Sequence, residues 1–124
     1  MNDREYAKQK KRIQALIERW VKPIGLGYWT INFEYSRERL GEAHVAEYDT
    51  LARTTSSWEY RHGLISFSMP NVMEIDDEEL ERAFVHELMH IFLNEMRDWT
   101  TDNNHEERVA SELTSAMLWV RGVE

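Results

Sequence analysis

The chain has 124 residues, of which 42% are hydrophobic and 31% are charged. This balance predicts one soluble globular domain, residues 1–124, that is long enough to bury a core. The absence of cysteine excludes disulfides and thiolate ligands, so a bound metal must use His and carboxylate groups. No apolar run reaches the roughly 18 residues that a membrane-spanning helix needs, and the charged N-terminus leads into no signal-peptide core. We therefore expect a cytoplasmic protein without a membrane partner.

The formal net charge of −8 argues against a nucleic-acid partner, since binding to phosphate backbones depends on clustered lysine and arginine. One basic cluster does occur, at residues 8–12. It could bind nucleic acid or an acidic partner, but the solvated face of an amphipathic helix explains it as well, and we favour that explanation. The sequence does not indicate an oligomeric state.

The first part of the chain predicts a helix followed by strands. Apolar residues recur at helical spacing over residues 3–22, and Pro23 should end that helix. Alternating side chains over residues 28–35 indicate a strand. Residues 43–49 indicate a second strand, in which His44 is a surface or core residue rather than a metal ligand.

A hairpin is expected next, from strands at residues 54–60 and 64–69 joined by a turn at residues 61–63. Residues 71–74 are expected to form a loop. A long helix should then run over residues 77–96.

Asp76 should cap this long helix, with Glu79 at the capping-box position. A final helix should begin with a cap at Asn103 or Asn104 and run to Val120. Together these elements predict an α+β fold with a small mixed or antiparallel sheet of three to four strands.

The long helix carries the motif H-E-x-x-H, formed by His86, Glu87 and His90. Residues four apart lie on the same face of a helix, so the two imidazoles can bind one metal ion. A catalytic zinc takes three protein ligands and a water, and a carboxylate beside that water can remove its proton. The motif therefore predicts two zinc ligands and, in Glu87, a catalytic base.

Chance is a weak explanation of the motif, because five His and 17 Glu in this chain predict only about 0.03 random matches. A structural explanation is that both histidines pack within the helix while Glu87 is solvated. The helix is apolar on nearly all sides, however, and buried histidines need polar partners, which a metal would provide. We favour the metal site.

A third ligand is needed, and the spacing alone does not choose among His105, Glu106, Glu107 and Glu112. A ligand at the start of a packed helix should be followed by apolar residues on its inward side. From Glu107 the apolar positions are Val109, Ala110, Leu113, Ala116 and Met117, whereas Arg108 and Glu112 follow Glu106 at spacings of two and six. Helical geometry therefore favours Glu107, with Glu106 second, although both could simply stabilise the helix N-terminus.

An H-E-x-x-H helix followed by a second helix that offers a Glu resembles the thermolysin-like gluzincin branch of zinc metallopeptidases. Over roughly residues 54–120 the chain is similar to the minimal gluzincin-like proteins of phages and bacteria, and more distantly to peptidases that cleave phage repressors. The resemblance implies a zincin-like fold in which an N-terminal helix and a small sheet accompany the H-E-x-x-H helix and a ligand-bearing C-terminal helix. It also implies Zn²⁺ bound by His86, His90 and Glu107.

The resemblance further implies that the protein hydrolyses a peptide or protein substrate, with Glu87 as the base. In the family such a substrate lies extended along a sheet edge, which here corresponds to Ser56, Ser57 and Trp58. His105 as the third ligand is disfavoured, because the residues after His90 lack the Gly and His of the metzincin pattern.

Two departures from the family pattern leave the function open. Ser111 stands where the family often has an Asp that orients a ligand. The larger gluzincins also take a transition-state-stabilising side chain from a further domain, so His105, His62, Tyr60 or Arg61 would have to substitute. The alternatives are a non-catalytic metal-binding regulatory or partner-binding module, and a partner-binding protein without metal.

Overall fold

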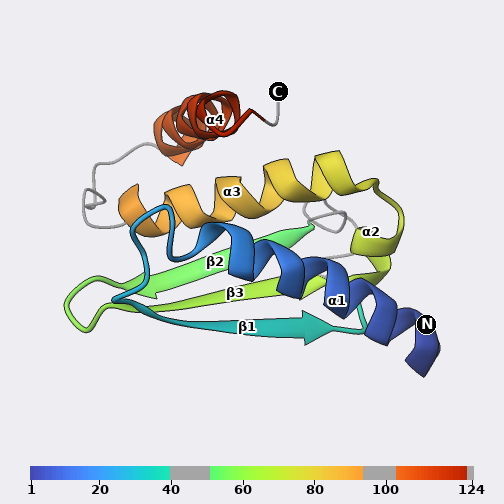
Figure 1. The fold of residues 1–124 in the computed structure, drawn as a ribbon. Helices are drawn as coiled ribbons and strands as arrows, with labels where there is room; N and C mark the ends of the chain where they lie inside the picture. The colour runs from blue at the N-terminus through green and yellow to red at the C-terminus, as the bar shows by residue number, and fades with distance from the viewer. Residues whose placement is uncertain (40–50, 94–102, 123–124) are drawn as a thin grey trace.

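The computed structural model describes residues 1–39, 51–93 and 103–122. Its elements are, in order, α1 (Asp3–Trp20), β1 (Thr30–Ser36), β2 (Ala52–Ser57), β3 (His62–Ser68), α2 (Met69–Met73), α3 (Asp77–Leu93) and α4 (Asn103–Val120) (Figure 1). These four helices and the small mixed sheet of the described residues confirm the expected α+β class. No helix of the described residues is long and apolar enough to cross a membrane.

The sheet has the strand order β1-β3-β2. β1 pairs with β3 in parallel, and β2 pairs with β3 in the antiparallel sense, with Thr54 opposite Ile65. The predicted hairpin is therefore confirmed, but its turn comes earlier than expected. Residues 58–60, expected to be strand, lie in the turn, and Arg61 closes it with a left-handed φ of 53°.

Helices α1 and α3 cover one face of the sheet, and α4 packs on the far side of α3 (Figure 1). The strands alternate accordingly. Ile65 and Phe67 point into the core, whereas Asn32 and Glu34 of β1 are exposed. α3 approaches β3 closely at Gly63, where an added Cβ would lie 3.2 Å from Ile91 Cδ1.

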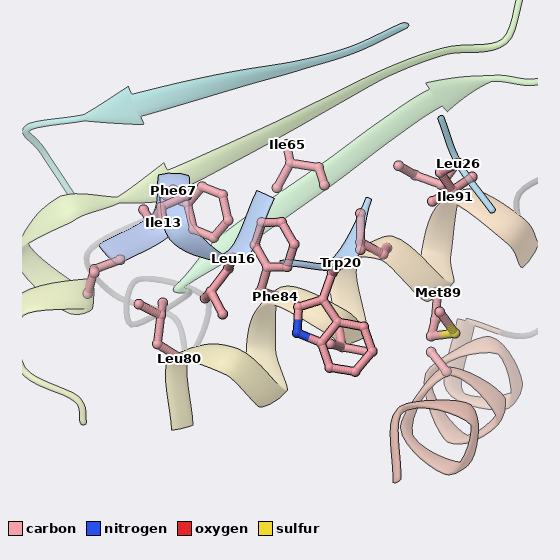
Figure 2. Close-up of a cluster of buried hydrophobic side chains, with 14 of the residues drawn as sticks. Ile13, Leu16, Trp20, Leu26, Ile65, Phe67, Leu80, Phe84, Met89 and Ile91 are labelled. Carbon is pink, nitrogen blue, oxygen red and sulfur yellow. The ribbon is translucent and has the colours of Figure 1, made fainter. Parts of the chain in front are cut away.

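Phe84 of α3 lies at the centre of the core, together with Trp20 of α1 (Figure 2). Its ring stacks between Phe33 and Phe67, with centroid distances of 6.0 and 6.1 Å. The indole of Trp20 donates a hydrogen bond to Glu81 Oε2 over 2.7 Å, which pairs the buried polar atoms of α1 and α3. Aromatic packing thus joins the sheet to the helix layer.

Arg12, part of the basic cluster at residues 8–12, is turned inward. Its guanidinium donates to the carbonyl oxygens of Val72 and Ile75 over 2.9 and 2.8 Å, and its Nε lies 2.7 Å from Asp77 Oδ1. Val72 lies in the last turn of the short helix α2, and Ile75 lies just beyond it, before α3 begins. This arginine therefore ties α1 to the segment that leads into α3.

Several expected boundaries differ from the observed ones. The first helix ends at Trp20 rather than residue 22, and the first strand begins at Thr30. The loop expected at residues 71–74 was wrong, because Met69–Met73 forms a short helix with proline in its first turn, where no amide hydrogen is needed. The strand expected at residues 43–49 lies outside the described residues, as do residues 94–96 of the long helix.

Replacing Phe84 by alanine should lower the free energy of unfolding by about 3–5 kcal/mol, because it removes a buried ring between two others. Phe92→Ala is the control on the same helix, since Phe92 is 40% exposed. It should cost about 1 kcal/mol or less. Urea denaturation followed by circular dichroism measures both values. Equal losses would contradict the central position of Phe84.

Candidate functional site

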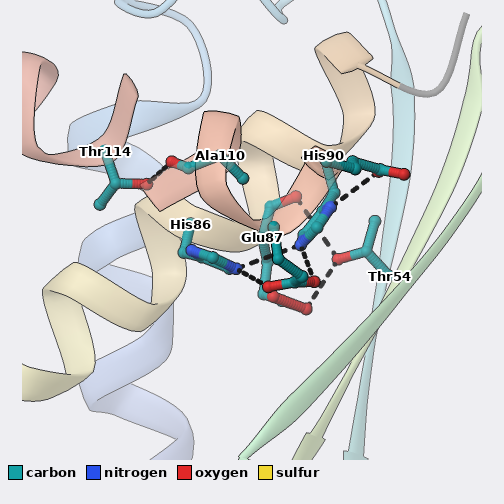
Figure 3. A network of polar contacts seen from close by, with 8 residues as sticks. Thr54, His86, Glu87, His90, Ala110 and Thr114 are labelled. Carbon is teal, nitrogen blue, oxygen red and sulfur yellow. Dashed lines mark hydrogen bonds and ion pairs between the residues drawn. The ribbon is translucent and has the colours of Figure 1, made fainter. Parts of the chain in front are cut away.

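Helix α3 presents His86, Glu87 and His90 along the edge that faces β2 and α4 (Figure 3). The helix begins as predicted, with the Glu79 amide donating to Asp76 Oδ1 over 2.8 Å. Glu87 is buried, whereas the imidazoles of His86 and His90 are partly exposed. The site therefore combines a buried carboxyl with two imidazoles that a small ligand can reach.

Helix α4 brings Glu106 and Glu107 to the same place. Its inward stripe consists of the buried residues Glu106, Ala110, Thr114 and Leu118. The Thr114 hydroxyl satisfies its hydrogen bond by donating to Ala110 O over 2.7 Å. The expected inward register is thus confirmed in part. Ala110 is buried, and Leu113 and Met117 pack against the core, but Ala116 is exposed, and the expected positions did not include the buried Glu106 at the start of the stripe.

The atoms of His86, His90 and Glu107 converge as a metal site requires. His86 Nε2 and His90 Nε2 lie 3.1 Å apart, and Glu107 places Oε2 3.0 Å from the former and Oε1 3.0 Å from the latter. Tetrahedral zinc with ligands at about 2.0–2.1 Å has ligand atoms about 3.3 Å apart. The three side chains therefore need to separate by only a few tenths of an ångström to hold such an ion.

The hydrogen-bonding roles of these atoms also fit a cation. His90 Nδ1 lies 2.9 Å from Glu106 Oε1, and a carboxylate can only accept, so we assign the His90 proton to Nδ1. The Nε2 lone pair of a neutral His90 then faces a Glu107 oxygen, which is another acceptor. A metal ion between them would satisfy both atoms.

Burial and the neighbouring His90 hold the pKa of His86 below its ordinary value, and Glu107 opposes part of this shift. A lowered pKa keeps the imidazole neutral near pH 7. Because a metal binds only the neutral imidazole, this shift favours binding at neutral pH.

Thr54 of β2 holds the carboxyl group of Glu87. The threonine hydroxyl donates to Glu87 Oε1 over 3.1 Å. Burial raises the pKa of Glu87 to about 7, while His90 and the Thr54 hydroxyl act in the opposite direction. A carboxyl group with a pKa in this range can both accept and release a proton near neutral pH.

A cavity of about 430 Å³ contains these groups. Its lining consists of Ala52, Arg53, Thr54, Thr55 and Ser56 from β2, His86, Glu87 and His90 from α3, and Glu106 and Glu107 from α4. Of the three residues expected to bind substrate, Ser56 lines this cavity. Ser57 ends β2, with its hydroxyl bonded to Glu59, and Trp58 lies in the turn.

The four side chains considered as transition-state stabilisers do not line this cavity. Tyr60, Arg61 and His62 lie at the turn end of the hairpin, and His105 is exposed beside Arg108. Ser111, the weaker substitute for an orienting Asp, is also exposed. The polar contact with His90 Nδ1 is made by Glu106 instead.

Thr54 is the site residue that the sequence did not indicate. A residue in a predicted strand can face either side of the sheet until the strand register is known. The pairing with Ile65 places Thr54 on the core side. No local pattern connects it with Glu87, from which it is separated by 33 residues. Ala52, Arg53 and Thr55 also line the cavity and were not predicted as site residues.

No protein-family model matches the chain, and searches of curated proteins and of solved structures also found no match. The chemistry of the site is therefore the basis on which a function can be inferred.

Substituting Glu107 by alanine should weaken Zn²⁺ binding by more than about 100-fold, because residues that only orient a ligand already change affinity about 10–100-fold. Glu112→Ala is the matched control, since Glu112 is an exposed carboxylate on the same helix. Competition with a chelating dye measures both affinities. Retention of the wild-type affinity in Glu107→Ala would remove this residue from the ligand set.

Proposed function

We propose that the protein is a zinc-dependent metallopeptidase of gluzincin type on a zincin-like fold. The observation that carries this proposal is the convergence of His86, His90 and Glu107 beside the buried Glu87, in one cavity along strand β2. Three protein ligands leave a fourth position for water, which is the pattern of catalytic rather than structural zinc.

When bound, zinc supplies a water of lowered pKa and a Lewis acid for the scissile carbonyl. Glu87 accepts a proton from the water while the water oxygen forms a bond to the carbonyl carbon. Glu87 then gives this proton to the leaving nitrogen as the carbon–nitrogen bond breaks. The products are a carboxylic acid and an amine. Thr54 holds the Glu87 carboxyl group through both transfers.

Strand β2 supports an extended peptide as the substrate. Among the described residues, β2 pairs with β3 alone, so its other edge carries backbone groups that can bind a further strand. Ala52 to Ser56 of this strand line the cavity. A peptide that pairs with this edge would place its backbone beside His86, His90 and Glu87.

A non-catalytic metal-binding regulatory or partner-binding module is the second candidate. It is favoured by the positions of Tyr60, Arg61, His62 and His105, which do not line the cavity and so offer no stabilising group there. Stoichiometric zinc without hydrolysis of any member of a peptide library would support this candidate.

The variant Glu87→Gln should lose peptide hydrolysis by about 10²–10⁴-fold while it still binds one zinc ion, because glutamine keeps the shape but cannot accept the proton. Cleavage of a quenched fluorescent peptide library and metal analysis measure the two properties. Glu59→Gln serves as the control, since Glu59 is exposed in the hairpin turn. Hydrolysis at the wild-type rate by Glu87→Gln would exclude Glu87 as the base.

Thr54→Val should lower kcat by about tenfold with little change in KM, because a hydrogen bond to a charged group contributes about 1.5–3 kcal/mol. Thr54→Ser keeps the hydroxyl and should retain most of the rate. Steady-state kinetics on one cleaved peptide measures kcat and KM for both variants. A serine variant as slow as the valine variant would show that packing, rather than the hydroxyl, is what matters.

A further inference from the structure

Glu106 is a buried carboxylate that takes no part in the proposed proton transfers. The residue is 6% exposed, and its Oε1 lies 2.9 Å from His90 Nδ1. Its neighbour Glu107 has a side chain that is 57% exposed at the cavity. Burying a carboxylate costs free energy unless donors compensate. The N–H group of His90 is such a donor, so the contact offsets part of the cost of burying Glu106.

The contact determines which nitrogen of His90 is available to a metal. Because His90 Nδ1 donates to Glu106, the lone pair of the neutral ring is on Nε2. Nε2 is the atom that lies 3.1 Å from His86 Nε2 and 3.0 Å from Glu107 Oε1. The carboxylate of Glu106 thus selects the tautomer whose lone pair faces the other two ligands.

Glu106 lies in the first turn of α4, so its contact with His90 joins two helices. An acceptor on Nδ1 also raises the basicity of the other ring nitrogen. Orientation and basicity therefore both favour metal binding at Nε2.

We propose that Glu106 is a positioning residue for the metal: it fixes the ring orientation and tautomer of His90 and so raises metal affinity. This role rests on the proposed function only in that a metal must bind to His86, His90 and Glu107. It also gives Glu106 and Glu107 different tasks, since the buried residue orients a ligand and the exposed one is a ligand.

The first test compares Zn²⁺ affinity in the wild type, Glu106→Leu, Glu106→Gln and Glu112→Leu. Leucine removes the acceptor for the His90 Nδ1 proton, whereas glutamine keeps an acceptor oxygen. Glu106→Leu should still bind one ion, with an affinity about 10–100-fold lower, and its Co²⁺ derivative should show a shifted visible spectrum, whereas Glu106→Gln should retain more of the affinity. Glu112→Leu should match the wild type. A folded Glu106→Leu with wild-type affinity and spectrum would overturn the proposal.

A second measurement uses the wild type alone and so does not depend on how a variant folds. Long-range proton–nitrogen NMR of the histidine rings should find His90 protonated at Nδ1, and added Zn²⁺ should shift Nε2. A proton on Nε2, or zinc on Nδ1, would overturn the proposal.

The ligand variants separate this inference from the proposed function. Zinc binding lost in Glu106→Ala but retained in Glu107→Ala would make Glu106 the ligand and overturn its positioning role, while the metal site would stand. A wild type that binds no zinc would overturn both. Unchanged affinity in Glu106→Leu, with peptide hydrolysis by the wild type, would overturn the positioning role alone.

Discussion

The structure depends on one constraint: an apolar central helix must carry three polar side chains along one edge. His86, Glu87 and His90 lie on α3, between the sheet and α4, where an unpartnered polar group would cost several kcal/mol. Each finds a partner on another element. Thr54 of β2 bonds Glu87, and the glutamates at the start of α4 contact both histidines. The placement of β2 and α4 is thereby tied to the polar edge of α3.

The features that could be predicted from the sequence are those governed by local physics. Asp76 caps α3 because a short acceptor side chain is followed by an acidic first turn, and the four-residue spacing of His86 and His90 places them on one face. Strand ends were predicted less well, since the aromatic residues Trp58 and Tyr60 favour strands. They lie in the turn because the chain reverses between Ser57 and His62, which pair across the hairpin.

The features that could not be predicted are long-range. Arg12 belongs to a basic cluster, and only the folded chain shows that it binds carbonyl groups about 60 residues away. Glu106 was ranked behind Glu107 because an inward stripe was assumed to be apolar. The observed stripe begins with this carboxylate, which is buried because His90 supplies a donor. A charged residue at an inward position is thus intelligible only through its partner.

Consecutive residues on a helix point about 100° apart, which explains how two adjacent glutamates can lie in different surroundings. Both residues line the cavity, but Glu106 is buried against His90 of α3, whereas the side chain of Glu107 is more than half exposed. The same helix start stabilises both negative charges. A shift of α4 by one residue would put Arg108 in the place of Glu107, or His105 in the place of Glu106, so one of the two carboxylates would be lost from the site. The register of α4 is therefore set by the histidines of α3 as much as by its apolar residues.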